Sequence, residues 1–339
     1  MSESANVFRI KAKTLSAVLS KMMGVPVSRA TYQTKPLQGG TVGDVRLVTG
    51  VAVCPDGDVP YKVVLKTQKK WTRHGDPLSW RREYDLYNSG LCALFGDGLC
   101  WPTCYHSEEA VNETRLWLEY IDGVTGAQLT IEHNEQAATE LGRFQGRVFS
   151  ETPHTLQNFP NLSKADGMKN FYLHYRSWDE VYDYVRKANC DIPPHLCKMI
   201  IDADEKSADV WKSIEKLPVV LCHRDFWVTN IFVSDGKIRL IDWDTTGWGY
   251  LGEDVISLIA DESDVNQMLE LYNRLVPAYR RGFQEFADIS QIPSLYVYER
   301  IVMHFGYRLV EWYLDADSPE RKALQVETLQ KIYEMGKMS

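Results

Sequence analysis

Short, mainly apolar strands with polar residues at or just beyond their ends restrict the fold of this chain more than any other feature. Three apolar stretches, at 219–222, 231–233 and 238–243, interrupt a region whose spacing otherwise predicts long helices. The last two are joined by Ser234-Asp235-Gly236-Lys237, a strong hairpin signal. The polar residues follow these strands, in Cys222-His223-Arg224-Asp225-Phe226-Trp227-Val228-Thr229-Asn230 and Ile241-Asp242-Trp243-Asp244.

The order of these polar residues predicts phosphoryl transfer. The pattern H-x-D-x-x-x-x-N, followed by an Asp that closes a hydrophobic strand, is typical of kinase sites. It gives Asp225 the role of base or hydroxyl-positioning residue, and Asn230 and Asp242 the roles of Mg²⁺ ligands, for which Mn²⁺ can substitute. His223 is expected to support the loop. The alternative is a turn in which Asp and Asn satisfy backbone groups, but their combined order favours the site.

The first third of the chain predicts a small antiparallel sheet. A helix at 12–23 comes first, and another, at 77–95, is inserted after the third strand. Pro55-Asp56-Gly57-Asp58 indicates a hairpin between the second and third strands. The five expected strands lie at 30–37, 45–54, 61–67, 101–106 and 115–121.

Lys66 lies near the end of the third strand, in Val63-Val64-Leu65-Lys66, as the β3 lysine of kinases does. A lysine on an apolar strand is costly unless its charge meets phosphates or a carboxylate. Glu83, on the next predicted helix, is the expected partner. The alternative is a surface lysine whose ammonium reaches water. In this setting the pair with Glu83 is favoured.

Two further segments of this region fit nucleotide binding by position. In the loop Gln38-Gly39-Gly40-Thr41-Val42-Gly43-Asp44, the residues Gly39, Gly40, Thr41 and Gly43 could bring backbone N–H groups to phosphates. The loop departs from G-x-G-x-x-G and is not a Walker A loop, and such hairpin turns are common without a ligand. Glu119 and Ile121, before the linker near 121–124, are expected to meet the purine edge.

Beyond that linker the pattern changes to helices. The fold class is therefore α+β, with two lobes: a β-sheet lobe at 1–121 that binds nucleotide, and a mainly helical lobe at 122–339 that carries catalysis and substrate binding. The segment 150–176 has no assignment. Helices are expected at 131–149, 177–188, 196–214, 263–286, 295–314 and 319–335.

Composition excludes several classes of protein. A net charge of −8 over 339 residues does not favour nucleic acid as a partner. No apolar run predicts a membrane span, and the first residues lack the pattern of a secretory signal, so a cytoplasmic protein is expected. Seven irregularly spaced cysteines predict reduced thiols, and Cys100 and Cys104 lack the second pair that a zinc site requires.

With both sets of residues in place, the chain resembles the aminoglycoside phosphotransferase and choline kinase group of small-molecule kinases. The resemblance runs from about Leu37 to Asp254, and is most specific at Leu221–Asp225 and Ile241–Trp243. It implies a two-lobed protein-kinase-like fold, ATP with Mg²⁺, and transfer of the γ-phosphate to a hydroxyl; GTP is the alternative nucleotide. Protein kinases match less well, because Trp227 stands where they carry a lysine.

The family places its acceptor in the helical lobe, where this chain is acidic and aromatic. The segment from Leu240 to Asn273 has no Lys or Arg. Its carboxylates would attract a cationic substrate, although those at 261–270 also fit a solvated helix face. Near the catalytic residues, Asp244, Asp254, Trp227 and Trp248 are the predicted substrate contacts. A second interpretation is an aromatic cage that binds a quaternary ammonium group. The alternative is that these aromatic residues simply pack in the core. They are Trp227, Trp243, Trp248, Tyr250, Tyr307 and Trp312.

Three functions compete at this stage. The first is an ATP-dependent kinase of a small cationic molecule, with an aminoglycoside-type antibiotic, and so antibiotic resistance, as the first choice. The second is a metabolic kinase for choline, an amino alcohol or a sugar. The third is a nucleotide-binding pseudokinase, which the joint presence of Asp225, Asn230, Asp242 and Lys66 disfavours. The expected assembly is a monomer or homodimer.

Overall fold

The computed structural model describes residues 9–37, 43–73, 76–151, 159, 161–175, 179–261 and 263–338. The chain divides into two compact units, described here one at a time. The first comprises residues 1–90 and 101–122, and the second residues 91–100 and 123–339. This division differs from the single boundary at 121/122 in two respects, the smaller being that Asp122 falls in the first unit. The stretch Leu91–Cys100 belongs to the second unit, because β5 (Leu99–Cys100) pairs in parallel with β11 (Lys237–Leu240).

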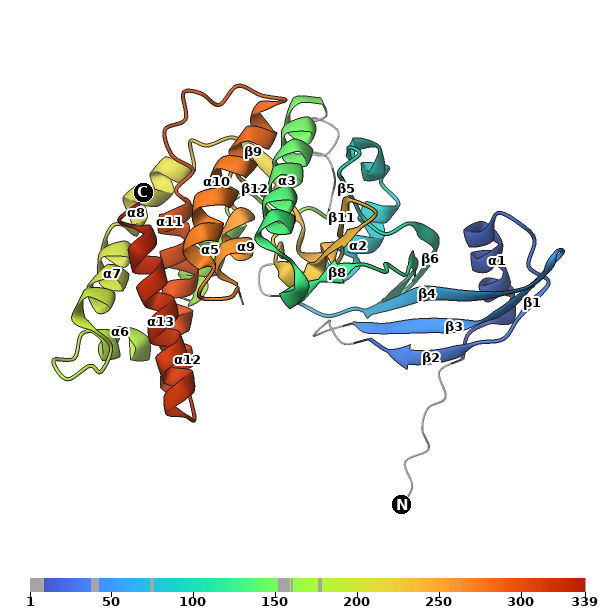
Figure 1. Ribbon diagram of the computed structural model, residues 1–339, viewed down its shortest axis with the longest axis horizontal. Coiled ribbons are helices and arrows are strands. Elements are labelled where there is room, and N and C mark those ends of the chain that lie inside the picture. The colour runs from blue at the N-terminus through green and yellow to red at the C-terminus, as the bar shows by residue number, and fades with distance from the viewer. Residues whose placement is uncertain are drawn as a thin grey trace, which may run out of the picture. The chain divides into compact units, whose positions relative to one another are not determined.

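The first unit is built on an antiparallel sheet (Figure 1). Its strands follow the order β1-β3-β4-β7-β6, and β2 also pairs with β3. The sheet has six strands where five were expected, because the run at 30–37 splits into two short strands that both pair with β3. The bounds are β1 Arg29–Ala30, β2 Gln33–Pro36, β3 Asp44–Cys54, β4 Gly57–Lys69, β6 Cys104–Ala110 and β7 Glu113–Glu119.

One helix buries an apolar face on this sheet. Helix α1 (Ala12–Met23) has the predicted bounds and ends at Gly24, whose φ of 71° suits glycine. Its buried leucines and valine join strand residues in one core cluster. The second expected helix is shorter than 77–95: α2 covers Ser79–Tyr87, and a separate 3₁₀ turn, η1 (Leu91–Leu94), follows Gly90, which has a φ of 80°.

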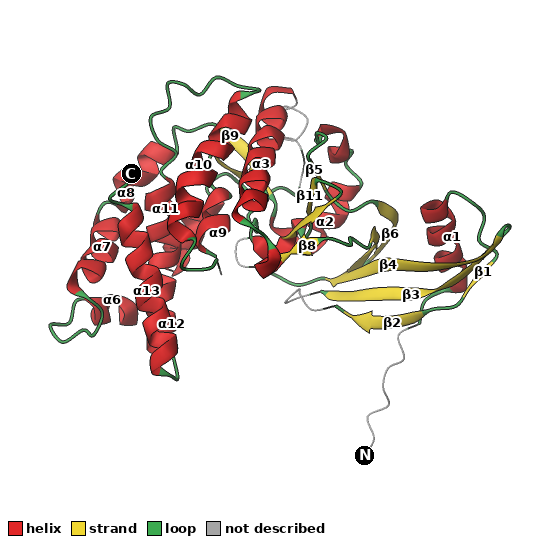
Figure 2. Ribbon diagram, viewed as in Figure 1, coloured by secondary structure: helices red, strands yellow, loops and turns green. Residues whose placement is uncertain are grey.

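The second unit is mainly helical (Figure 2). Its described helices confirm most of the expected segments, with two differences. The helix predicted at 196–214 is two helices that meet at Lys206, and the helix at 295–314 contains a π-helical turn, η5 (Val302–Gly306). The unassigned segment contains α5. The bounds are α3 Ile131–Glu151, α5 Gly167–Tyr175, α6 Asp179–Val185, α7 Pro194–Glu205, α8 Ser207–Ile214, α9 Val255–Ala260, α10 Met268–Gln284, α11 Val297–Ile301, α12 Tyr307–Asp315 and α13 Pro319–Met335.

Helices α3 and α10 pack side by side at unusually short range (Figure 1). A Cβ atom at Gly142 would lie 2.2 Å from the backbone oxygen of Tyr279, and one at Gly282 would lie 2.1 Å from that of Thr139. Glycine is therefore required at the crossing. This close approach brings Gln145 of α3 next to Tyr279 of α10, where both support the candidate site.

Two small sheets in the second unit carry that site. In one, β9 (Val219–Cys222) pairs with β12 (Gly247–Tyr250). In the other, the predicted hairpin of β10 (Ile231–Ser234) and β11 is confirmed and is flanked by β8 (Val124–Thr125) and β5. Within the described residues, no helix combines the length and apolar character that crossing a membrane requires.

Candidate active site

The loop that carries Asp225 leaves the buried strand β9 and is fixed to the core at two points. The Phe226 side chain is fully buried, and the His223 ring, also buried, packs edge to face on Trp243 with their centroids 4.7 Å apart. Thr245 Oγ1 donates a hydrogen bond of 2.7 Å to the backbone oxygen of His223. These contacts hold His223 in the core, and its role in supporting the loop stays a prediction.

Asn230 lies directly against Asp225. Its Nδ2 donates to the Asp225 Oδ2 at 2.7 Å and to the backbone oxygen of Asp225 at 2.9 Å. Asn230 closes a 3₁₀ turn, η3 (Val228–Asn230), rather than opening the next strand as the sequence indicated. An amide whose nitrogen faces Asp225 turns its oxygen away from that carboxylate, and this oxygen is the atom that could bind a metal ion.

Asp242 lies two residues beyond the hairpin, and the residue before it, Ile241, bonds to the Asn230 backbone. The pairing of β10 with β11 ends at Ile231 and Leu240, and the N–H of Ile241 then donates to the backbone oxygen of Asn230 at 3.0 Å. Strand β11 therefore stops at Leu240, three residues before the end of the run expected at 238–243. Asp242 itself has a left-handed backbone, with a φ of 65°, and precedes the 3₁₀ turn η4 (Trp243–Thr245).

The carboxylates of this loop affect one another. Burial raises the pKa of Asp225 to about 7, the negative charge of Asp242 adds to the rise, and the Asn230 hydrogen bond opposes it. Asp244 and Asp261 raise it slightly further. A divalent cation would relieve this repulsion.

The donor set fits Mg²⁺, because Asp242 supplies one carboxylate and Asn230 one amide oxygen on adjoining backbone. Mg²⁺ takes only one or two protein carboxylates and completes its shell with phosphates and water. Within the described ranges, no group of three or more His, Cys, Asp and Glu side chains could hold a metal ion.

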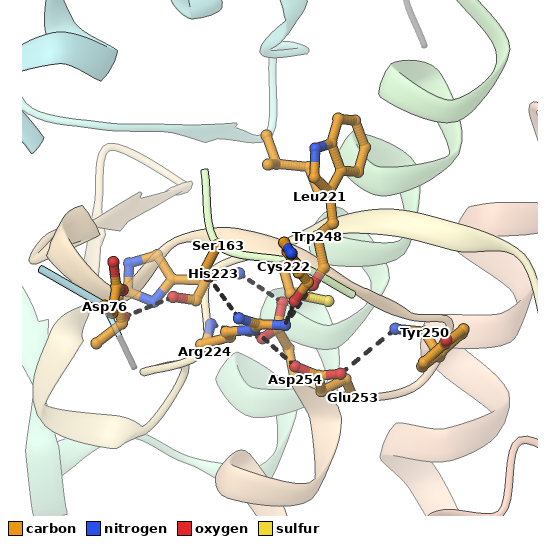
Figure 3. Close-up of polar contacts among 12 residues, drawn as sticks. Asp76, Ser163, Leu221, Cys222, His223, Arg224, Trp248, Tyr250, Glu253 and Asp254 are labelled. Atoms are coloured by element: carbon orange, nitrogen blue, oxygen red, sulfur yellow. Dashed lines mark hydrogen bonds and ion pairs between the residues drawn. The ribbon is translucent and has the colours of Figure 1, made fainter. Parts of the chain in front are cut away.

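Asp254 supports the loop from beneath, which differs from the substrate contact predicted for it. Its carboxylate is 2% exposed and accepts hydrogen bonds from the backbone N–H groups of His223, at 2.8 Å, and Arg224, at 2.7 Å. Gln145 Nε2 donates to it at 2.8 Å, and the Tyr279 hydroxyl donates to Gln145 Oε1. Figure 3 shows Asp254 beside His223 and Arg224. These bonds orient the chain that leads to Asp225.

Arg224 fixes the other side of the loop (Figure 3). Its guanidinium donates to Glu253 Oε1 at 2.8 Å and to Ser163 Oγ at 2.6 Å, and also bonds the backbone oxygens of Lys164 and Trp248. The backbone of Arg224 is left-handed, with a φ of 67°. Sequence reasoning missed this arginine, Ser163, Gln145 and Tyr279, because their partners lie far away along the chain. The Arg inside the H-x-D pattern was the available signal.

The remaining predicted substrate residues lie in mixed surroundings. Asp244, Trp227 and Trp248 are half-buried, so each has surface that a ligand could reach. Trp248 belongs to β12 and its N–H donates to the Ser163 backbone oxygen at 2.9 Å. Two of the residues proposed for the aromatic cage cannot contact a ligand, because Trp243 and Tyr307 are buried in the core and only 1% and 4% exposed.

In the first unit, Lys66 and Glu83 form the predicted ion pair. Lys66 Nζ of β4 lies 2.5 Å from Glu83 Oε2 of α2, and the two side chains are only 12% and 7% exposed. Both neighbours of β4 position the lysine, since Lys66 pairs with Val45 of β3 and with Leu116 of β7. The ion pair is therefore built into the sheet and does not depend on a flexible surface chain.

The other predicted nucleotide contacts are less constrained by the structure. Gly39, Gly40 and Thr41 lie outside the described residues. Gly43 precedes β3, where a Cβ would lie 2.6 Å from Gln68 Oε1. Glu119 closes β7 and its Oε2 accepts from the Thr103 N–H at 2.9 Å, and Ile121 follows it, half-buried. Their proposed contact with a purine stays a prediction.

Comparison with known proteins identifies the family. The sequence profile of the phosphotransferase enzyme family matches residues 102–289, more than half of the chain. The chain belongs to this family. It is a kinase of small molecules, as its motifs predicted, and its fold is protein-kinase-like. A comparison with curated proteins found no match.

Solved structures share the fold at low sequence identity. An aminoglycoside phosphotransferase from Alicyclobacillus acidocaldarius is 14% identical with a TM-score of 0.59, over 99% of this chain and 98% of that one. A microcompartment-associated aminopropanol kinase is 15% identical with a TM-score of 0.56, over 94% and 95%. An amicoumacin kinase in complex with AMP-PNP and Ca²⁺ is 12% identical with a TM-score of 0.53, over 89% and 88%.

Proposed function

We propose that this phosphotransferase moves the γ-phosphate of ATP to a hydroxyl of a small cationic molecule, with an aminoglycoside-type antibiotic as the first candidate. The observation that carries the proposal is the arrangement of Asp225, Asn230 and Asp242. A carboxylate with a raised pKa lies in contact with an amide, and a second carboxylate follows on the adjoining backbone. This is the set that phosphoryl transfer to an alcohol requires.

Each residue has a distinct task in this proposal. Asp225 accepts the proton of the acceptor hydroxyl as the new bond to phosphorus forms, and its burial, which raises its pKa, favours that transfer. Asn230 orients that carboxylate. Asn230 and Asp242 would hold Mg²⁺, which supplies charge neutralisation of the triphosphate. Lys66, oriented by Glu83, binds phosphate oxygens. The AMP-PNP bound to the similar amicoumacin kinase favours an adenine nucleotide, with GTP as the alternative.

The choice of acceptor rests on charge. Asp244 and Asp261 add negative charge near Asp225 and raise its pKa, and such a region concentrates a polycationic acceptor. One of the similar structures is named as an aminoglycoside phosphotransferase, and aminoglycosides are polycationic acceptors. The similar aminopropanol kinase supports the second candidate, an amino alcohol, which carries one positive charge.

A substrate screen tests the proposal. ADP release would be measured with MgATP and a panel of aminoglycosides, aminopropanol, choline and uncharged sugars, with the Asp225→Asn variant as the background control. We expect turnover with a cationic acceptor that the variant lacks. Turnover only with an uncharged sugar would contradict the charge argument. Slow ATP hydrolysis that no acceptor accelerates would favour a pseudokinase.

The metal assignment needs its own measurement. MgATP should raise the midpoint of thermal unfolding, and ATP with excess chelator should raise it far less. The Asp242→Asn variant should show the small shift in both conditions. Equal shifts with and without chelator in the unmodified protein would contradict the roles given to Asn230 and Asp242.

A further inference from the structure

Two thiols lie in contact at the junction between helices α6 and α7. Cys190 Sγ and Cys197 Sγ are 3.6 Å apart, and both cysteines are free. That separation is van der Waals contact between two sulfurs, and a disulfide would bring them to about 2.05 Å. A second sulfur–sulfur contact, of 3.5 Å, joins Cys54 to Met23, but the thioether of methionine cannot form a disulfide.

The backbone holds both thiols in place. Cys190 closes a turn through its N–H to the Lys187 oxygen at 3.2 Å, and Cys197 lies in the first turn of α7, with its N–H 3.2 Å from the Pro193 oxygen. Between them, Ile192 is 1% exposed, and Pro193 and Pro194 restrict the chain. The short connecting segment therefore has little freedom to separate the two sulfurs.

The two cysteines differ in their access to solvent. Cys190 is half-buried, whereas Cys197 is 5% exposed and its Sγ contacts the Ile192 backbone oxygen at 3.6 Å. Burial raises the pKa of Cys197 to about 12, and the neighbouring thiol of Cys190 adds to the rise. A soluble oxidant would therefore react with Cys190 first, and the thiol of Cys197 already lies in contact with the oxidised sulfur.

We propose that Cys190 and Cys197 form an oxidisable pair that closes a reversible disulfide when the protein meets a hydroperoxide. Cys190 Sγ attacks a peroxide oxygen: the S–O bond forms, the O–O bond breaks, and the leaving oxygen departs with the thiol proton as water or alcohol. Cys197 Sγ then attacks Cys190 Sγ; the S–S bond forms, the S–O bond breaks, and hydroxide leaves with the Cys197 proton as water. Two thiols are oxidised and one peroxide is reduced.

The ring formed in this way ties the loop after α6 to the first turn of α7. Helix α7 packs against η5 and α13, and α6 packs against α12 (Figure 1). The disulfide closes a short ring in a segment that is already ordered, so we expect it to stabilise this corner of the second unit without moving its helices.

Peptide mapping tests the pair directly. The folded protein would be treated with stoichiometric hydrogen peroxide, alkylated and digested with trypsin without reductant. Cleavage after Lys187 and Lys198 leaves both cysteines in one peptide, Ala188–Lys198. We expect this peptide to lose the mass of two hydrogens and to escape alkylation, and dithiothreitol to reverse both changes. The midpoint of thermal unfolding should rise by a few degrees on oxidation.

Matched variants separate the pair from general thiol oxidation. Cys190→Ser should abolish the mass loss and the thermal shift, while its unfolding midpoint in reducing buffer stays that of the unmodified protein. Cys92→Ser, which removes an exposed thiol, should change neither. Recovery of Ala188–Lys198 with both cysteines alkylated, or with Cys190 carried on to sulfinic acid while the protein is still folded, would overturn the proposal.

Discussion

The Lys66–Glu83 pair allows the structural role of a residue to be separated from its proposed role in the reaction. Lys66→Met keeps an unbranched side chain of similar length and removes only the ammonium. Glu83, 7% exposed in its side chain, then stays in place without the charge that lies 2.5 Å from it. The expected result is a loss of stability in the first unit, because a buried carboxylate has lost a cation that pairs with it.

The size of this loss follows from burial. Two opposite charges about 4 Å apart attract by roughly 4 kcal/mol at the effective dielectric constant of about 20 that suits protein sites. Removing one partner of a buried pair typically costs about 3–5 kcal/mol. Lys62→Met is the matched control: the same residue type on the same strand, 57% exposed, with its carboxylate partner, Asp122, 3.9 Å away. That change should cost at most about 1 kcal/mol.

Together with Glu83→Leu, the double variant Lys66→Met/Glu83→Leu completes the double-mutant cycle. It removes both charges and leaves two apolar side chains in a buried position, and such replacements are often neutral for stability. We expect it to recover most of the stability that Lys66→Met loses. Hydrogen exchange of the amides in β3, β4 and β7 would measure the change in the first unit alone.

Activity should not follow stability in this cycle. If Lys66 binds phosphate oxygens, the double variant regains its fold but keeps the low kcat/KM for ATP of the single variant. Recovery of kcat/KM together with stability would refute the phosphate role. A stability loss for Lys66→Met no larger than that for Lys62→Met would refute the argument from burial.

Three other changes test separate parts of the molecule. Asp225→Asn should lower kcat by about 10²–10⁴-fold and leave the Kd for MgATP, from calorimetry, within about threefold; loss of nucleotide binding would contradict its role as base. Burial, and then the charge of Arg308, lower the pKa of His304 to about 3 in the folded protein. The neutral ring therefore contributes fully to the free energy of unfolding above about pH 6.5, and this contribution is lost as the pH falls below that value. Urea unfolding should show the unmodified protein losing up to about 2 kcal/mol between pH 6.5 and 5 through this group, and His304→Phe should lack that loss; equal pH slopes would refute it. Gly142→Ala should lower the free energy of urea unfolding by about 1–3 kcal/mol, because its methyl group would clash where α3 crosses α10. Ser150→Ala, on the exposed face of α3, should have little effect. Equal effects of the two changes would argue against the close crossing.

The sequence was sufficient for the fold class, and it predicts those site residues whose pattern lies within a short stretch of chain. The H-x-D-x-x-x-x-N pattern and the Asp after the hairpin both lie within 23 residues, Cys222–Asp244, so they can be read together from the sequence. Lys66 and Glu83 are separated by a loop, but an isolated lysine on an apolar strand demands a partner on physical grounds. Both predictions depend on short distances along the chain or on a cost that only one kind of partner can offset.

The residues that hold the site in place could not be read in the same way. Asp254 was assigned to substrate because an acidic residue close to the motif has no distinguishing mark in sequence, while its hydrogen bonds to the loop depend on a turn of the backbone at Arg224. Gln145 reaches Asp254 only because glycines let α3 approach α10. The Pro- and Asn-containing segment at 150–176 had no periodicity, yet Ser163 bonds both Arg224 and β12.

The backbone at Arg224 and Asp242 connects this support to the proposed chemistry. Both residues are left-handed without being glycine, a conformation that costs roughly 1–2 kcal/mol each. Such strain persists only where surrounding contacts over-determine it. At Arg224 the guanidinium and the N–H are both bound, to Glu253 and to Asp254. The contacts that offset the strain are therefore the ones that fix the direction of Asp225, and in a reaction that depends on positioning, loosening them should lower kcat before it unfolds the second unit.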